Sequence, residues 1–170
     1  AGSREARGRT LAIAARKKRG GTPHWAGVVS PGGAHSHQAP GSALRNILTE
    51  PGVAGVAHAI TDGRDTPPQS AGEDLKRFTA ALPKSVPIAT VVGRYYAMDR
   101  DKRWERVGLA YNAIVEAEGP RFADPQAAIA DAYAKKQFDE LILPAVIGDY
   151  RGLRDGAGVL CFNFQPARVP

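Results

Sequence analysis

The chain has 170 residues and a formal net charge of +6, with 23 Lys and Arg against 17 Asp and Glu. All of that charge lies in residues 1–20, which hold seven basic side chains and one acid, whereas residues 21–170 hold 16 of each. A basic chain is commonly interpreted as a binder of nucleic acid or of membrane surfaces. The neutral body excludes a broad basic surface, so any such surface would be the N-terminal segment alone.

Composition narrows the class of protein further. With 43% hydrophobic and 24% charged residues, the chain is typical of a globular protein. No apolar run approaches the roughly 18 residues of a membrane span, so we expect no membrane partner. The single cysteine, Cys161, excludes an internal disulfide and fits a reducing compartment. Because the chain begins with Ala and stops straight after a strand-like run, we expect it to be part of a longer protein.

Residues 1–20 are predicted to be a basic helix or linker at the edge of a domain. Residues 4–18 can form a helix with a thin apolar face that ends at Gly20-Gly21. An Arg-rich, acid-poor start is also typical of an organelle transit peptide, and a nucleic-acid-binding arm is a third alternative. The narrow apolar stripe favours a solvated edge helix, and we expect no nucleic-acid partner.

From there on, apolar runs alternate with helical patterns. Strands are expected at 24–29, 55–60, 86–92 and 158–164, with a short extended run within 138–147, and helices at 42–49, 70–82, 101–117 and 125–136. Such alternation is typical of helices layered on a mostly parallel sheet. We therefore predict an α/β fold, a single three-layer domain over residues 21–170 with a mostly parallel central sheet flanked by helices.

The helix at 101–117 has the clearest apolar periodicity. Asp99 or Asp101 is the expected N-cap, because short acidic side chains accept the free N–H groups of a first turn. The apolar face is expected to comprise Trp104, Val107, Tyr111, Ile114 and Val115.

Polar residues follow the expected strands. The carboxyl ends of parallel strands meet at one edge of a sheet, and ligands bind there. Three or four arginines, one or two histidines and several aspartates lie in these segments. Guanidinium groups bind phosphate and carboxylate oxygens bidentately, so the pattern predicts a site for a small phosphorylated acid. The segments are Ser30–His37, Thr61–Pro68, Gly93–Asp101 and Gln165–Arg168.

Several of these residues have structural alternatives. The pair His35-x-His37 could hold a metal or make loop hydrogen bonds, although zinc normally needs three or four ligands. Asp62 and Asp65 could cap helices or pair with Arg64.

The basic residues at the start of the helix expected at 101–117 also have a structural alternative. We interpret Lys102, Arg103 and Arg106 as a solvated helix face. Arg94 and Arg100 are expected in the loop before that helix, where an anion would also meet the helix N-terminus.

Four motifs together resemble the cofactor-independent phosphoglycerate mutases, over about residues 10–168. That family combines an alkaline-phosphatase-like domain with an inserted phosphotransferase domain. The resemblance implies that this chain is the inserted domain alone, without the phosphatase-like domain that carries the metal ligands and the phosphorylated serine. The motifs are TDGRDTPP at 61–68, GRYYAMDRDKRWER at 93–106, SPGGAHSH at 30–37 and Phe162-Asn163-Phe164.

The resemblance also implies roles for particular residues. His35 is similar to a substrate-contacting histidine, and Arg64 with Asp65 to a pair that binds the glycerate, with Asp65 as the catalytic residue that moves its hydroxyl proton. Arg94 and Arg100 are similar to arginines that clamp the carboxylate and phosphate, and Arg168 to the second arginine of a closing motif.

The implied activity is the interconversion of 3- and 2-phosphoglycerate, an isomerase step of glycolysis and glucose catabolism. The implied partners are these two substrates and the phosphatase-like domain of the same enzyme. We expect a cytoplasmic monomer that binds no metal or cofactor itself, whereas the complete enzyme would use Mn²⁺ or another divalent metal. Without the missing domain, the isolated chain should be inactive.

The chain also departs from the family pattern. Gln165 replaces the first arginine of the closing motif, Ala167 replaces its acidic neighbour, and Ala39-Pro40 stands where Asp and His are usual. Loss of a guanidinium from a phosphate clamp removes a contact of roughly 1.5–3 kcal/mol. The alternative function is therefore a non-catalytic module that binds a phosphorylated acid.

Overall fold

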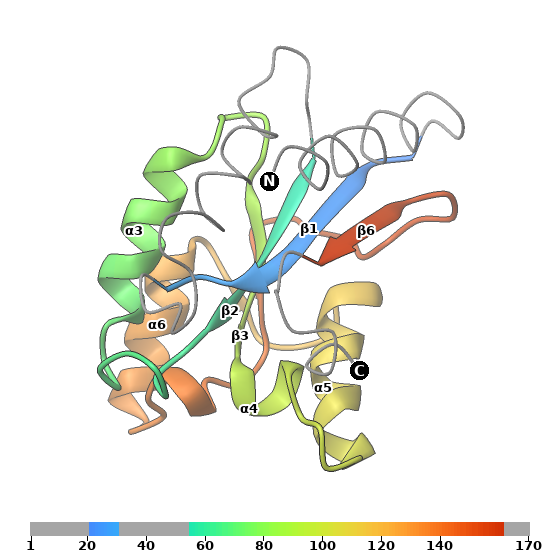
Figure 1. Cartoon of the computed structure of the whole chain (residues 1–170). Helices are drawn as coiled ribbons and strands as arrows, with labels where there is room; N and C mark the ends of the chain where they lie inside the picture. Colours follow the sequence, from blue (N-terminus) through green and yellow to red (C-terminus); the bar gives the residue numbers. More distant parts are fainter. Residues whose placement is uncertain (1–20, 31–54, 162–170) are drawn as a thin grey trace, which may run out of the picture.

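The computed structural model of the chain describes residues 21–30 and 55–161. They form a six-stranded sheet in the order β4-β5-β3-β2-β1-β6 (Figure 1). The strands are β1 (Pro23–Val28), β2 (Val56–Thr61), β3 (Ile88–Gly93), β4 (Arg121–Phe122), β5 (Ala145–Ile147) and β6 (Gly158–Cys161).

The pairing of the strands confirms the expected mostly parallel sheet. β1 pairs in parallel with β2 and with β6, β2 with β3, and β4 with β5, whereas β3 and β5 run antiparallel. β1, β2 and β3 therefore end at the same edge of the sheet.

Helices cover both faces of the sheet, which confirms the three-layer α/β fold. In Figure 1, α3 and α6 lie side by side on one face, and α5 lies on the other. The main core lies between the sheet and the α3–α6 layer, around Trp25, Leu75, Ile129 and Ile142. The helical elements are α3 (Ala71–Ala81), α4 (Arg94–Ala97), α5 (Trp104–Val115), α6 (Pro125–Ala134) and the single 3₁₀ turn η1 (Asp139–Leu141).

The two helices of the α3–α6 layer are capped in different ways, α6 by a local signal and α3 by a distant side chain. The Asp124 side chain accepts the Ala127 N–H at 2.9 Å and Pro125 opens α6, as the Asp-Pro pair predicts. The cap of α3 comes from far along the chain, because buried Asp139 accepts the N–H groups of Ser70 and Ala71 at 2.8 and 2.9 Å. Burial raises the pKa of Asp139, although these bonds favour its ionised form.

Two predictions about α5 are wrong. The helix begins at Trp104 and its N-cap residue is Arg103, which makes no capping side-chain bond. Trp104 and Tyr111 are also 67% and 59% exposed, and the residues that α5 buries are Ala110 and Ala113. The predicted apolar face is therefore wrong for the two aromatic residues, whereas Val107, Ile114 and Val115 are half-buried.

Two further corrections concern the segments beside the strands. Arg94 does not lie in a loop, because β3 passes straight into the short helix α4. The extended run expected within 138–147 is divided into η1 and β5. The expected helices at 4–18 and 42–49 lie outside the described residues, as do residues 162–164 of the last strand.

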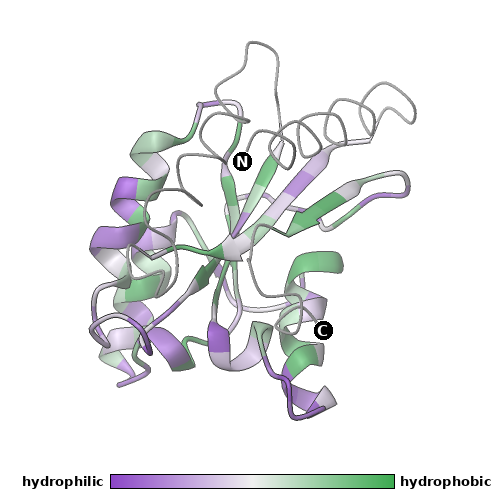
Figure 2. Ribbon diagram, in the orientation of Figure 1, coloured by the Kyte–Doolittle hydropathy of each residue, from purple (hydrophilic) through white to green (hydrophobic). Residues whose placement is uncertain are grey.

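Figure 2 shows hydrophilic residues along the outer side of α3 and in the loop between α4 and α5.

A histidine cluster lies inside the sheet, formed by His24 of β1, His58 of β2 and Thr90 of β3. His24 Nδ1 lies 2.9 Å from His58 Nε2, and His58 Nδ1 lies 2.8 Å from Thr90 Oγ1. The two rings stack with centroids 5.2 Å apart, and Tyr150 meets the His58 ring edge-on. All three cluster residues are buried.

No helix among the described residues has both the length and the apolar character needed to cross a membrane.

Candidate anion-binding site

The ends of β1, β2 and β3 bring three polar side chains together. The Ser30 hydroxyl, just beyond β1, donates to Asp62 Oδ2 at 2.9 Å. Arg94, just beyond β3, donates through Nη1 to Asp62 Oδ1 and, at 3.0 Å, to Asp65 Oδ2. Arg94 is only 6% exposed, so this is a buried ion pair at the carboxyl edge of the sheet.

Burial and pairing act in opposite directions on this ion pair. Burial favours the neutral form of Asp62, but the hydrogen bonds from Arg94, from the Asp65 N–H and from Ser30 outweigh it and lower the pKa of Asp62. Burial likewise disfavours the Arg94 cation, yet its bonds to Asp62 and Asp65 raise the Arg94 pKa above its ordinary value. Both groups are therefore charged at neutral pH.

The turn after β2 holds Arg64 at the surface. Asp62 Oδ1 accepts the N–H groups of Arg64 and Asp65 at 3.3 and 3.2 Å, which closes a tight turn. Gly63 adopts φ +70°, a conformation that glycine takes without strain. The Arg64 side chain forms an ion pair with Glu140 while remaining largely exposed. Arg64 is therefore available to an incoming anion.

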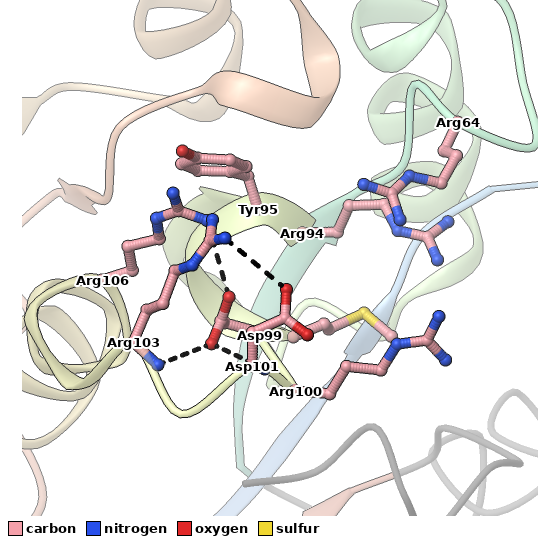
Figure 3. Close-up of a pocket in the computed structure, with 9 residues that line it drawn as sticks. Arg64, Arg94, Tyr95, Asp99, Arg100, Asp101, Arg103 and Arg106 are labelled. Carbon is pink, nitrogen blue, oxygen red and sulfur yellow. Dashed lines mark hydrogen bonds and ion pairs between the residues drawn. The ribbon is translucent and has the colours of Figure 1, made fainter.

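Arg64 and Arg94 border a pocket of about 240 Å³ beyond the strand ends. Figure 3 shows Arg64, Arg94 and Arg100 on one side of it and Arg103 and Arg106 on the other. The pocket is lined by five arginines together with Tyr95, Met98, Asp99 and Asp101.

The five arginines of the pocket differ in how their charges are compensated, and Arg64 and Arg94 have the acidic partners described above. Arg100 forms no ion pair with any residue in the described ranges 21–30 and 55–161. Arg106 is 3.5 Å from Asp99 and lies over the Tyr95 ring, with its guanidinium carbon 3.9 Å from the ring centroid. Arg103 has a long, exposed contact of 3.9 Å with Asp101. Of the five pocket arginines, Arg100 is thus the one whose charge the described residues compensate least.

A comparison with known protein families identifies the chain. Residues 5–170 match the family described as "BPG-independent PGAM N-terminus (iPGM_N)". The chain belongs to this family. The resemblance found in the sequence is therefore confirmed.

Curated relatives agree with this family assignment. The 2,3-bisphosphoglycerate-independent phosphoglycerate mutase of Rhodopseudomonas palustris is 63% identical over 153 residues, which are 90% of this chain and 30% of that protein. The protein of the same name from Gluconobacter oxydans is 50% identical over 157 residues, or 92% of this chain and 31% of that protein. The chain therefore spans about 30% of the length of these relatives.

A solved structure agrees as well. The fold is similar to that of Leishmania mexicana phosphoglycerate mutase, crystallised at low cobalt concentration, with a TM-score of 0.83 and 27% identity. That match covers 97% of this chain and 34% of the other.

The iPGM_N fold places the residues singled out from sequence in different ways. Arg64, Arg94 and Arg100 border the same pocket. Asp65 pairs with Arg94 beside that pocket, and not with Arg64, whose acidic partner is Glu140. His35 and Arg168 lie outside the described residues.

One pocket arginine departs from the solvated helix face predicted for it. Arg106 lines the pocket and is only 21% exposed, because it packs against Asp99 and the Tyr95 ring. Arg103 is exposed, as predicted, although it also lines the pocket. Lys102 is exposed, as expected.

The acidic groups of the site do not suit a metal. Within residues 21–30 and 55–161, no group of three or more His, Cys, Asp or Glu side chains is placed to hold a metal ion. Asp62 and Asp65 bind Arg94, and Asp99 binds Arg106. The described residues therefore do not fit a metal cofactor, whereas guanidinium groups around a pocket are suited to an anion.

Proposed function

We propose that this chain is the phosphotransferase domain that binds phosphoglycerate in a 2,3-bisphosphoglycerate-independent phosphoglycerate mutase. The observation that carries the proposal is the pocket at the strand ends, with five arginines around about 240 Å³. Both 3- and 2-phosphoglycerate carry a carboxylate and a phosphate, and guanidinium forks match the oxygens of both groups. Membership of the iPGM_N family supports this choice of ligand.

The arginines would have different roles in binding the substrate. Arg64 and Arg100 have exposed side chains and can turn toward the two anionic groups of the substrate. Arg94 is held by Asp62 and Asp65, so its position is set before the ligand arrives. A preset cation binds without losing side-chain freedom at that moment, which favours affinity.

Asp65 is the proposed group for proton transfer. Its carboxylate is partly exposed and is oriented by the 3.0 Å bond from Arg94, next to the pocket. A carboxylate in that position could accept the proton of a substrate hydroxyl and return it after the phosphoryl group has moved. We propose that His35 and Arg168 complete the substrate site.

The remaining two thirds of the enzyme would supply the rest of the reaction. We propose that residues 1–20 are an edge segment, that residues 21–170 are the substrate-binding domain, and that a phosphatase-like domain provides the serine that carries the phosphoryl group. That domain would also hold Mn²⁺ or another divalent metal, which stabilises charge on the phosphoryl group when bound. The complete enzyme would act as a cytoplasmic monomer in glycolysis, and this chain alone would not turn over substrate.

Calorimetric titration with 3-phosphoglycerate tests the proposal. Arg100→Ala should weaken binding by about ten- to a hundredfold, the share of one charge-assisted contact. Arg77→Ala is the matched control, because Arg77 is an exposed arginine of α3 that does not line the pocket. Equal binding by wild type and Arg100→Ala, or no binding by wild type, would contradict the proposal.

The altered closing motif favours a second candidate, a non-catalytic module that binds phosphorylated acids. Gln165 and Ala167 replace residues that the family usually has charged. A coupled mutase assay on an enzyme that contains this domain and the remaining two thirds separates the two functions. Turnover supports the mutase, whereas tight binding of 3-phosphoglycerate without turnover supports the module.

A further inference from the structure

The loop between α4 and α5 is built around one acidic side chain. Asp99 is 5% exposed, and its Oδ2 accepts the N–H of Asp101 at 3.1 Å and that of Arg103 at 2.9 Å. Its Oδ1 faces Arg106 at 3.5 Å. One carboxylate thus fixes the backbone on both sides of Lys102 and binds a side chain of α5.

That loop contains a strained residue. Lys102 has φ +59°, a left-handed conformation that costs a residue with a Cβ about 1–2 kcal/mol. The two N–H bonds to Asp99 come from the residues on either side of Lys102. Strain of this kind persists only where the surroundings hold the backbone, and it concentrates at functional sites.

A second contact holds Arg106 in place. Its guanidinium lies over the ring of Tyr95, which belongs to α4, while Asp99 follows α4 and Arg106 belongs to α5. Tyr95, Asp99 and Arg106, here called the Asp99 clamp, therefore join the two helices around the loop. In Figure 3, Asp99 is drawn between Arg106 and Arg100, and Tyr95 lies on the opposite side from Arg100.

Arg100 is the loop residue that such a clamp would serve. It directly follows Asp99 and lines the pocket, yet it has no ion pair among the described residues to fix its direction. Because Arg106 and two N–H groups satisfy Asp99, the carboxylate is engaged away from Arg100. The charge of Arg100 stays available to an anion.

We propose that Asp99, held by Arg106, is a positioning residue that sets Arg100 in its phosphoglycerate-binding geometry. This inference rests on the proposed function, since Arg100 must bind the anion for its position to matter. Arg106, which also lines the pocket, acts in this proposal through its contacts with Asp99 and Tyr95. The affinity for 3-phosphoglycerate then depends on Asp99 only as long as Arg100 is present.

A double-mutant cycle tests this dependence. We would titrate 3-phosphoglycerate into wild type, Asp99→Ala, Arg100→Ala and the double variant. Each single variant should bind about tenfold or more weakly, and the double variant should bind no more weakly than Arg100→Ala alone. Glu105→Gln is the matched control, because it removes one negative charge from the first turn of α5 at an exposed residue outside the pocket.

The outcomes separate this inference from the proposed function. If Arg100→Ala weakens binding but Asp99→Ala does not, or if the two effects multiply in the double variant, the clamp is overturned and the proposed function stands. If wild type does not bind, or Arg100→Ala binds as wild type does, both are overturned.

Loss of the fold can be distinguished from loss of positioning. Circular dichroism reports whether Asp99→Ala is folded. Should it unfold, Asp99→Asn takes its place, because its amide oxygen can still accept the two N–H bonds while the ion pair with Arg106 is lost. The clamp predicts weaker binding for Asp99→Asn than for Glu105→Gln, and equal binding by these two variants would overturn it.

Discussion

The same three parallel strands carry two polar clusters of opposite character. Within the sheet, His24, His58 and Thr90 form a buried, uncharged cluster. At the carboxyl ends of the strands, Asp62 and Arg94 form a charged pair that borders the pocket. The residues of the first cluster bond to one another, whereas the second lies beside exposed arginines such as Arg64.

The two clusters differ in whether their surroundings stabilise a charged side chain. Burial lowers the pKa of His58 to about 3, because it disfavours a charged imidazolium, and neighbouring His24 disfavours a second positive charge. In the charged pair, two carboxylates compensate Arg94 and raise its pKa. A buried polar cluster therefore remains neutral unless opposite charges are built beside it. This contrast supports the proposal that an anion binds at the strand ends and not at the histidines.

The largest expected effect comes from breaking the charged pair. Arg94→Met would leave Asp62 buried without its counter-ion, which costs about 3–5 kcal/mol of unfolding free energy. Urea unfolding measures that loss. Arg64→Met is the matched control, because Arg64 is exposed and its ion pair should contribute about 0–1 kcal/mol. Equal losses in the two variants would contradict the assignment of Arg94 to a buried pair.

The next effect tests the close packing behind the pocket. At Gly93, an added Cβ would lie 2.3 Å from the Glu140 carbonyl oxygen and 2.7 Å from the Ile142 nitrogen, both backbone atoms. Gly93→Ala should therefore destabilise the chain by about 1–3 kcal/mol in urea unfolding.

Gly108 provides the control for that substitution. It lies inside α5 with nothing within 4 Å of an added Cβ. Gly108→Ala should stabilise the chain by about 0.5–1 kcal/mol. Stabilisation by both substitutions would show that η1 does not pack against the end of β3.

A further effect, which appears only as the pH changes, separates the histidine cluster from the charged pair. The folded state keeps His58 neutral, whereas the unfolded state takes up a proton below its pKa of 6.5. The contribution of His58 to stability is thus complete above pH 6.5 and is lost as the pH falls toward 3. Between pH 7 and 5 the loss should be about 2 kcal/mol.

Unfolding curves across that interval measure this loss. His58→Gln, which can keep hydrogen bonds to both neighbours but cannot titrate, should have a smaller loss from pH 7 to 5. A slope unchanged by the substitution would mean that His58 titrates freely in the folded chain.

Patterns local in the sequence predicted much of the fold. Alternating apolar runs located β1, β2 and β3, and Asp124-Pro125 marked the start of α6, because these signals depend on neighbours in sequence. The shared edge of the parallel strands predicted that Arg64, Arg94 and Arg100 would lie together, and the structure brings them to one pocket.

Long-range pairing determined the features that sequence did not reveal. The bonds from Arg94 to Asp62 and Asp65 join residues 32 and 29 positions apart, so no local pattern showed that Arg94 would be buried and paired. In α5, Trp104 and Tyr111 are exposed, and the small Ala110 and Ala113 are the buried residues. Apolar residues at helical spacing predict an apolar face on a helix, but they do not show whether another element covers that face.

The contrast between the two clusters can be tested in one experiment, by titrating 3-phosphoglycerate into the isotopically labelled chain and following its amide signals by NMR. If the anion binds at the strand ends, we expect saturable shifts at Arg64 and across the segment from Arg94 to Arg106. His24, His58 and Thr90 should change little. Shifts centred on the histidine cluster, or none at the arginines, would contradict it.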